Sequence, residues 1–316
     1  MGRSRPRGLL AKAGGAVSIA LVRGVFAAAR ALGPDRSSDL GAFLVRTVGP
    51  FLKQHRTALA NLRAAFPEAS EAEIRRIARG AWANLGRTGA EYAHLGSLFD
   101  FDFGRREAAP GRVEMIGAEQ ADALRDDRLP AVVFSAHLGN WELPAIAAAR
   151  HGLNMSAVFR PPNDPAAAKL LHEVRSGTMG GLMDATGSRP ASAINAVLEG
   201  GGHLAQLIDQ HFTRGVPVTF MGRTALANPL LAKLARRHDC PVHGTRVVRL
   251  PGHRFRVELT PPISMPRDAE GRIDVVGAAQ AMTAVVEDWV REHPEQWLWM
   301  HRRWRAPPQA ARDGSL

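Results

Sequence analysis

The sequence predicts an α/β protein with a mostly parallel central sheet flanked by helices, preceded in the chain by a helical, membrane-associated layer. Three observations support this fold class. From Val113 onward, short apolar runs alternate with longer helical patterns, which is typical of parallel strands joined by helices. Leu40 to Leu98 is rich in Ala, Leu, Arg and Glu and shows no strand-like alternation. Finally, 316 residues with 45% hydrophobic composition are enough to bury the core of one large domain.

The first 34 residues are strongly basic. The first acidic residue is Asp35, and the cations before it are Arg3, Arg5, Arg7, Lys12, Arg23 and Arg30. The longest uncharged run, Ala13 to Val22, is well short of the ~20 residues that a membrane span needs. On a helix, Lys12, Arg23 and Arg30 fall within about 20° of one another and form one basic stripe. We therefore predict that residues 1–34 form a basic amphipathic helix that lies on a membrane surface.

Two alternatives for this segment remain open. A signal peptide would use Arg3 to Lys12 as its charged region, Ala13 to Val22 as its apolar region and Ala27 to Ala29 as a cleavage-like site, although Arg23 interrupts that layout. The other alternative is an amphipathic helix that packs on its own domain.

Residues 35–110 are predicted to form a helical cap region. The residues Gly33, Pro34 and Asp35 break the first helix. Further along, Ser70 is placed as an N-cap with Glu73 three residues later, and this capping box opens a helix over Glu71 to Leu85.

Residues 111–305 are predicted to form the α/β domain, and residues 306–316 a loose tail. The expected strands are Ala131 to Ser135, Ser156 to Phe159, Leu204 to Ile208, Val216 to Phe220, Val242 to Val248 and Phe255 to Leu259. The expected helices are Leu143 to Arg150, Ala166 to Arg175, Ala191 to Leu198, Pro229 to His238 and Val275 to Glu292. Alternating short strands and helices predict a mostly parallel sheet.

The charge balance limits the class of partner. Lys and Arg number 41 against 30 Asp and Glu, a formal net charge of +11, so the partners are expected to be negatively charged. Aromatic residues are not interleaved with the basic ones, which argues against a nucleic-acid partner and leaves anionic lipid or an acidic carrier protein. The single cysteine, Cys240, excludes an internal disulfide and a multi-cysteine zinc site, and it fits a reducing, cytoplasmic compartment.

The candidate active site is the segment from Ser135 to Glu142. A buried strand ends just before His137, and open α/β sheets place their reactive groups at the carboxyl ends of strands. Residues five apart on one helix point about 140° away from each other, so His137 and Glu142 can meet only if the histidine precedes the helix. Asn140, as an N-cap, supplies that break. We predict a dyad in which Glu142 fixes the imidazole and His137 accepts a proton from an alcohol.

Two further features of this segment fit acyl transfer. Gly139 allows close backbone approach, and the amides at the helix N-terminus can stabilise an oxyanion. We therefore expect Gly139 and Asn140 to contribute to substrate binding.

The residues His137 to Glu142 resemble the signature of a histidine, four residues and an acid found in glycerolipid acyltransferases, in the form of the late lipid A biosynthesis (lauroyl/myristoyl) acyltransferase family. Other segments resemble that family in the same order along the chain. They are Asn61 to Glu68, Asn84 to Arg87 with Glu91 and Tyr92, Val158 to Asn163, Asp209 to His211, and His293 to Arg303.

The resemblance implies a reaction and its partners. A fatty acyl chain passes from acyl carrier protein to a hydroxyl of a lipid A precursor, at the cytoplasmic face of the cell inner membrane. We expect no metal and no diffusible redox cofactor to be needed. The family includes members with a clear membrane-spanning segment, whereas here Lys12, Arg23 and Arg30 interrupt the apolar run.

Three more residues enter as substrate-binding candidates. By resemblance, Arg160 belongs to the active-site cleft and Asp209 is the family's second acidic position, although a solvated loop arginine and a buried ion pair are open alternatives. Arg175 closes a predicted helix, where it can equally interact with the helix dipole. At the carboxyl end, Trp297, Trp299 and Trp304 fit either an interfacial belt or a packed final segment.

Rival functions differ in how much of the sequence they explain. An acyltransferase acting on another glycolipid, such as a mannosylated phosphatidylinositol, would share these motifs. A serine hydrolase would need a Gly-x-Ser-x-Gly elbow and a zinc hydrolase paired ligands such as His-Glu-x-x-His, and neither pattern is present. A non-enzymatic basic membrane-binding protein is the alternative from another class. The acyl chain length and the acceptor cannot be deduced from the sequence.

Overall fold

The computed structural model describes residues 22–106, 111–161, 165–184 and 190–304. Its α-helices are α2 (Pro34–Val48), α3 (Lys53–Ala65), α4 (Glu71–Glu91), α5 (Leu95–Leu98), α6 (Ala118–Asp126), α7 (Leu143–Arg150), α8 (Pro165–Ser176), α9 (Pro190–Glu199), α10 (Leu230–His238) and α11 (Val275–Glu292). Its strands are β1 (Val113–Ile116), β2 (Ala131–Ser135), β3 (Met155–Phe159), β4 (Gly181–Asp184), β5 (His203–Leu207), β6 (Val216–Phe220), β7 (Arg223–Ala227), β8 (Val242–Leu250) and β9 (Arg254–Leu259).

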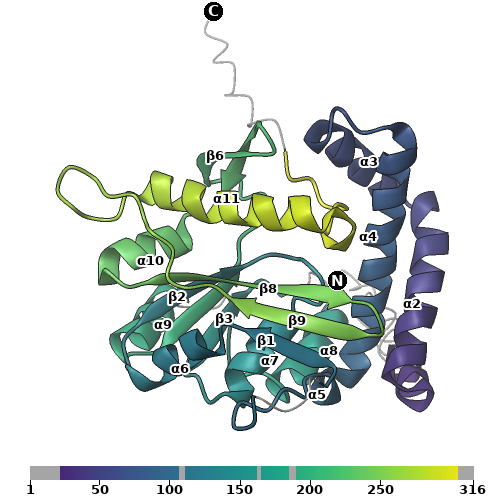
Figure 1. Cartoon of the computed structure of the whole chain (residues 1–316), viewed down its shortest axis with the longest axis horizontal. Helices are drawn as coiled ribbons and strands as arrows, with labels where there is room; N and C mark the ends of the chain where they lie inside the picture. The colour runs from purple at the N-terminus through teal and green to yellow at the C-terminus, as the bar shows by residue number, and fades with distance from the viewer. Residues whose placement is uncertain (1–21, 107–110, 162–164, 185–189, 305–316) are drawn as a thin grey trace, which may run out of the picture.

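The central sheet has seven strands in the order β1-β9-β8-β2-β5-β3-β4. Strands β8 and β9 are antiparallel, whereas all other neighbouring pairs of this sheet are parallel. Figure 1 shows α10 and α11 on one side of the sheet and α6 and α7 on the other. The predicted fold class, a mostly parallel sheet flanked by helices, is therefore confirmed.

The two faces of β2 are both buried, which explains why this strand reads as a continuous apolar run. Because side chains alternate along a strand, Val132 and Phe134 pack into the core on the α11 side, where Phe134 stacks on Trp289 with ring centroids 5.6 Å apart. Val133 and Ser135 face the α7 side, where they line a cavity. Strand β2 thus crosses the core and ends at Ser135, next to that cavity.

The helical layer formed by α2, α3 and α4 stands beside the sheet (Figure 1). The predicted capping box is confirmed, since the Ser70 hydroxyl accepts from the Glu73 amide at 3.2 Å and α4 begins at Glu71. The break at Gly33 is also confirmed, because its φ of +79° separates the helix over residues 22–32 from α2. Gly41 and Gly86 let α2 and α4 approach closely, since a Cβ on either would overlap the other's carbonyl oxygen.

Some elements differ from the prediction. The segment Val216–Phe220 was expected in the parallel sheet, but it pairs antiparallel with β7 as a separate hairpin beside α11. Its one-sided alternation, with Val218 and Phe220 buried, fits a half-covered hairpin better than a two-sided core strand. The strands β1, β4 and β7 and the helix α6 were not predicted. Each of these strands is only four or five residues long and carries polar or small residues.

The carboxyl-terminal tryptophans belong to a packed segment. Trp297 and Trp299 have 0% exposure, so an interfacial belt at these positions is wrong and the packed alternative is confirmed. Asn61 in α3 donates to the carbonyls of Trp299 (2.9 Å) and His301 (2.7 Å), and it thereby ties the segment to the helical layer.

The predicted membrane helix is described only from residue 22 onward. Residues 22–32 are helical, Ala29 is buried, and Arg30 donates to the Ala93 carbonyl at 3.2 Å. Within the ranges that the structure describes, no helix combines the length and the apolar character needed to cross a bilayer. The expectations for residues 1–21 and for the tail at 306–316 lie outside the described residues.

Candidate active site

Three candidate residues gather at one edge of the sheet. Strand β2 pairs with β5 and β5 pairs with β3, all parallel, so their carboxyl ends meet at the same edge. His137 lies two residues after β2, Asp209 lies two residues after β5, and Arg160 directly follows β3. Sheet pairing thus brings together residues that are up to 72 positions apart in the chain.

His137 is bonded to Asp209. The ring Nδ1 lies 2.8 Å from Asp209 Oδ1, and the His137 backbone amide donates to Asp209 Oδ2 at 2.9 Å. The indole of Trp297 donates to the same Oδ2 at 2.7 Å. The Asp209 side chain is completely buried, whereas that of His137 keeps 16% exposure. Burial raises the pKa of Asp209, but the charge and hydrogen bonds of His137 outweigh it and hold that pKa well below its usual range.

This pairing corrects the expected dyad. The Glu142 carboxylate accepts from Arg175 instead, with Nε–Oε2 at 2.9 Å and Nη2–Oε1 at 2.5 Å. The hydroxyl of Tyr92 also donates to Glu142. The physical reason is that the helix begins only at Leu143, so Glu142 lies in the preceding turn and points toward α8, while the adjacent strand β5 brings Asp209 to His137.

The cluster of Tyr92, Glu142 and Arg175 is buried and strongly coupled. Its side chains are only 4% exposed at Glu142 and 13% at Arg175. Burial lowers the pKa of Arg175, but the Glu142 carboxylate outweighs that effect and raises it. Burial and the same carboxylate raise the pKa of Tyr92, so its hydroxyl remains a donor. Tyr92 is the chain's single tyrosine, and sequence reasoning gave it no role although it stands in one of the recognised motifs.

The expected substrate contacts of Gly139 and Asn140 are also revised. Asn140 has 0% exposure, its Oδ1 accepts from the Glu142 amide at 3.2 Å and its Nδ2 donates to Glu91 at 2.8 Å. Gly139 has a φ of +58°, and a Cβ there would overlap the Val247 carbonyl oxygen. The close backbone approach that Gly139 permits is therefore to β8, and both residues shape the segment from within.

Gln210 lies near the exposed side of His137, and Arg160 lies at the same edge of the sheet. Gln210 Nε2 lies 3.4 Å from His137 Nε2, at the long end of the hydrogen-bond range. Arg160 is exposed at the end of β3, on the same edge. Gln210 follows Asp209 directly, so the motif that drew attention to Asp209 also contained the signal for Gln210.

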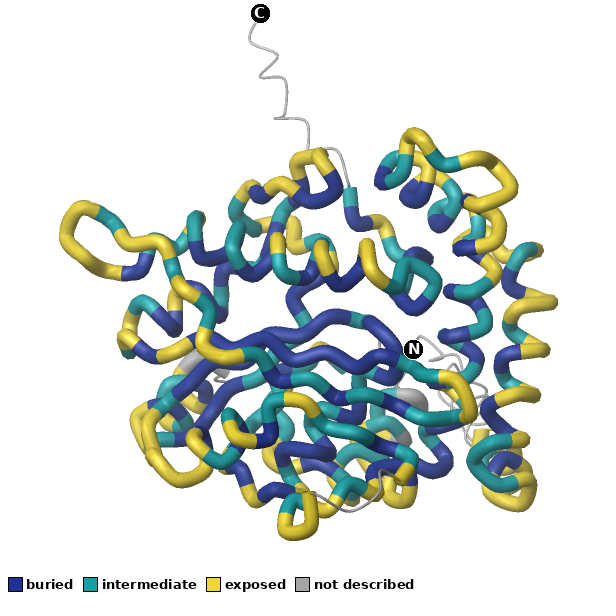
Figure 2. The backbone as a smooth tube through the Cα atoms, viewed as in Figure 1, coloured by how far each residue is buried: buried dark blue, intermediate teal, exposed yellow. Residues whose placement is uncertain are grey.

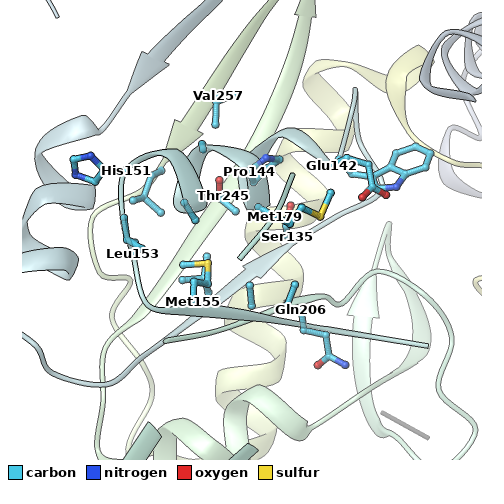
Figure 3. Close-up of a pocket in the computed structure, with 18 of the residues that line it drawn as sticks. Ser135, Glu142, Pro144, His151, Leu153, Met155, Met179, Gln206, Thr245 and Val257 are labelled. Carbon is cyan, nitrogen blue, oxygen red and sulfur yellow. The ribbon is translucent and has the colours of Figure 1, made fainter. Parts of the chain in front are cut away.

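An apolar cavity lies between β2, β5 and β9 and the helices α6 and α7. The empty space between these elements, counted together with the open solvent at its mouth, is roughly 880 Å³. Trp141, Glu142 and Arg175 line one part, and Phe103, His151 and Leu153 line another. Figure 3 shows Glu142 and His151 on opposite sides of the pocket, with Ser135 and Met179 between them.

The two ends of the cavity differ in chemistry. At one end Trp141, which lines the cavity, contacts His137 edge-on, with ring centroids 5.3 Å apart. At the other end His151 stacks on Phe103 at 3.9 Å and bonds Asp122 at 2.9 Å. The cavity is therefore apolar along most of its lining and comes within one side chain, Trp141, of His137.

Comparisons with known proteins give a consistent result. A family model described as "Bacterial lipid A biosynthesis acyltransferase" matches residues 13–306. The chain is similar to the lipid A biosynthesis myristoyltransferase of Escherichia coli (strain K12), with 26% identity over 283 residues that cover 85% of this chain and 81% of the relative. The lipid A biosynthesis acyltransferase 1 of Shigella flexneri is similar to the same extent, at 26% identity with the same coverage.

Proposed function

Because this chain belongs to the bacterial lipid A biosynthesis acyltransferase family and is an acyltransferase, we propose that it transfers a fatty acyl chain from an acyl-carrier-protein thioester to a hydroxyl of a lipid A precursor. His137 is the general base, and Asp209 orients it. The observation that carries this proposal is the His137–Asp209 pair in contact with Trp141, which lines an apolar cavity.

The reaction follows from this geometry. Because Asp209 is bonded to Nδ1, Nε2 of His137 is the ring nitrogen that accepts the proton of the acceptor hydroxyl. The acceptor oxygen attacks the thioester carbonyl carbon and a tetrahedral oxyanion forms. As it collapses, the carbon–sulfur bond breaks, and the leaving thiolate takes the proton back from the imidazolium. The products are an ester and a free thiol, and Asp209 stays ionised because its pKa is held low.

The Glu142 carboxylate has a different task in this proposal. It fixes the guanidinium of Arg175 at the cavity opening by two hydrogen bonds. A guanidinium held there adds positive charge where the thioester oxygen becomes negative. Arg160, exposed on the same edge of the sheet, is proposed to contact an anionic group of the acceptor.

The cavity is the proposed site of the acyl chain of the donor. Its lining consists largely of Ala, Val, Leu, Met and Phe side chains, and burying a chain against them is favoured by about 0.8 kcal/mol per methylene. The family members named above act in lipid A biosynthesis, one of them as a myristoyltransferase. A long acyl donor is consistent with both facts.

The proposed location is the cytoplasmic face of the inner membrane. Most of the exposed large apolar side chains in the described part of the chain lie between residues 22 and 52, among them Phe43 (56%) and Phe51 (87%). Figure 2 shows the outer side of α2 as exposed. Arg36, Arg46 and Lys53 are exposed nearby, so the surface pairs apolar groups with cations, as contact with anionic lipid requires.

The test is an acyl-transfer assay with the full chain. Acyl-carrier-protein thioesters are incubated with a tetra-acylated lipid A precursor, and the products are analysed by mass spectrometry. We expect one added acyl ester with the wild type and almost none with His137→Ala, whose folding is checked by circular dichroism. Full turnover by His137→Ala would refute the assignment of the base. Replacing the acceptor by a phosphatidylinositol mannoside tests the alternative acceptor, and replacing the donor by acyl-coenzyme A tests the carrier protein.

A further inference from the structure

A buried ion pair lies against the segment that carries His137. Arg249 on β8 donates to Glu91 at the end of α4 through two bonds, Nη1–Oε1 at 2.6 Å and Nη2–Oε2 at 3.0 Å. The Glu91 side chain is 2% exposed and that of Arg249 12%. Neither residue contributes to the chemistry described above, although Glu91 stands in a motif shared with the family.

The pair is connected by hydrogen bonds to Gly139 and Asn140, directly through Glu91 and indirectly through Asn84. Glu91 Oε2 accepts from Asn140 Nδ2 at 2.8 Å. The Gly139 carbonyl accepts from Asn84 Nδ2 and from the Thr88 hydroxyl, each at 3.1 Å. Asn84 Oδ1 in turn accepts from Arg249 Nε at 3.0 Å. Two side chains of α4, Asn84 and Thr88, therefore hold a single peptide, and Arg249 on β8 in turn holds Asn84.

This peptide decides the direction of the residues on both sides. Gly139 has a left-handed φ of +58° two residues after His137, and its amide donates to the Gln296 carbonyl at 3.1 Å. On the other side, Asn140 Oδ1 holds the Glu142 amide. A rotation of the Gly139–Asn140 peptide would move His137 relative to Asp209 and Glu142 relative to Arg175.

We propose that the buried Glu91–Arg249 pair is a positioning device for the active site, fixing the Gly139–Asn140 peptide and thereby the geometry of His137. It joins the helical layer to the sheet at the point where the reaction takes place. A buried ion pair adds little net stability once the desolvation of both charges is counted. Its effect is therefore expected on the geometry of the site more than on the stability of the fold.

The ionisation of the pair supports this role. Burial raises the pKa of Glu91, but the charge of Arg249 and the hydrogen bonds from Arg249, Ser38 and Asn140 outweigh it and lower that pKa. The carboxylate is thus ionised throughout the range in which the enzyme is assayed. Ser38 lies on α2 and donates to Glu91 Oε1 at 2.8 Å, so the first helices of the layer also take part.

The experiment separates positioning from stability, and it rests on the proposed function of His137. In the double variant Glu91→Met/Arg249→Met, apolar side chains of similar length replace both charges. We expect a lower melting temperature, because Asn84 Oδ1, Asn140 Nδ2 and Ser38 each lose a partner. We also expect a kcat per folded protein at least tenfold lower and a KM within twofold. Glu91→Gln, which keeps the shape and removes the charge, is expected to lower kcat at least fivefold. A kcat per folded protein within twofold of the wild type in both variants would overturn the proposal.

The matched control is the ion pair between Arg246 on β8 and Glu258 on β9, whose side chains are 10% and 20% exposed. Arg246→Met/Glu258→Gln is expected to lower the melting temperature, because Glu292 also loses its bond to Arg246, and to leave kcat unchanged. A readout independent of activity is the ¹⁵N spectrum of the histidine rings, in which the His137 signals are expected to shift in the Glu91/Arg249 variant and not in the control. Unshifted His137 signals refute the positioning role. An inactive wild type refutes the proposed function instead.

Discussion

Asp209 and Glu142 are both buried carboxylates, yet their replacement by amides is expected to have different effects. Asp209→Asn removes the charge that stabilises the imidazolium and presents a donor to Nδ1, so we expect kcat to fall about 10³-fold or more. Glu142→Gln leaves His137 paired and weakens the hold on Arg175, so we expect a smaller loss of kcat and a higher KM for the donor. Initial rates at several donor concentrations measure both effects.

The ionisation of Asp209 determines the pH range in which the two variants can be compared. The pKa of Asp209 is depressed, so its ionisation stabilises the native state above the ordinary value of 3.8 and is lost only as the pH falls below it. Asp209 therefore does not titrate between pH 5 and 9. An equal loss of activity in Glu142→Gln and Asp209→Asn would contradict the assignment of Asp209 and favour Glu142 as the partner of His137.

At the residue scale, the sequence pointed to His137 and to both acids, Glu142 and Asp209. The prediction that Glu142 is the partner of His137 was wrong, because Asp209 is its partner. The spacing of five residues between His137 and Glu142 permits contact but does not require it. The actual partner, Asp209, is 72 residues away and depends on β5 being the neighbour of β2. Strand order is set by the packing of the whole sheet, and apolar runs alone do not reveal it.

At the element scale, prediction was most accurate where burial gives a strong pattern. Strand β2 and the helices α7 and α11 have the predicted bounds. Strand β2 is buried on both faces, and α11 begins at a side-chain cap formed by Asp274. The N-cap of α7 is Glu142 and not the predicted Asn140. The short strands β1 and β4 were missed, since each has four residues and only partial burial. The domain boundaries at residues 34, 110 and 305 stay a prediction.

The outer face of α2 and the turn that follows it give the prediction at this scale. Phe43→Ser/Phe51→Ser removes two exposed aromatic side chains from the proposed lipid contact, and we expect binding to vesicles containing anionic lipid to fall at least tenfold. Cosedimentation measures the bound fraction. Leu129→Ser, which removes an exposed side chain (60%) elsewhere, is the matched control and should bind like the wild type. Unchanged binding together with a smaller oligomer would assign this face to a second copy of the chain.

At the scale of the whole molecule, the cavity is formed by residues from most parts of the α/β region, including β1, β2, β5, β9, α6 and α7. No local pattern marks such residues, because each is an ordinary apolar side chain of its own element. This is why the depth of the cavity, and with it the acyl chain length, was beyond sequence reasoning. The basic character of the chain, in contrast, was readable from composition alone.

The far end of the cavity allows a test of the acyl site. Ala148 on α7 lines it together with His151 and Leu153, so Ala148→Leu is expected to shorten the cavity and shift the preference toward shorter acyl donors. The cost of overpacking is expected to be about 1–3 kcal/mol of stability. Competition between carrier-protein thioesters of different length, followed by mass spectrometry, measures the preference. Ala149→Leu, at a neighbouring position that does not line the cavity, should retain the wild-type preference.

The stability of the whole chain is predicted to fall as the pH drops below 6.5. His151, His203 and His243 are buried, and burial is the main reason why their pKa values lie below the ordinary value of 6.5. In the unfolded chain these histidines therefore become protonated near pH 6.5, whereas in the native state they become protonated only at lower pH. Between the native-state pKa of such a histidine and 6.5, the free energy of unfolding falls by up to about 1.4 kcal/mol for each pH unit of acidification.

His203 isolates one of these contributions. Its Nε2 bonds the Leu124 carbonyl at 2.8 Å, a contact that the amide of His203→Gln can keep, while the titrating ring is removed. Urea unfolding at a series of pH values from 7.5 to 4.5 gives the free energy of unfolding of both proteins. We expect the free energy of unfolding of the variant to fall less over this range than that of the wild type. The difference in slope is expected to be at most that of one titrating group. Parallel curves for the two proteins would mean that His203 is protonated in the native state as readily as in the unfolded chain, which its burial between β5 and α6 argues against.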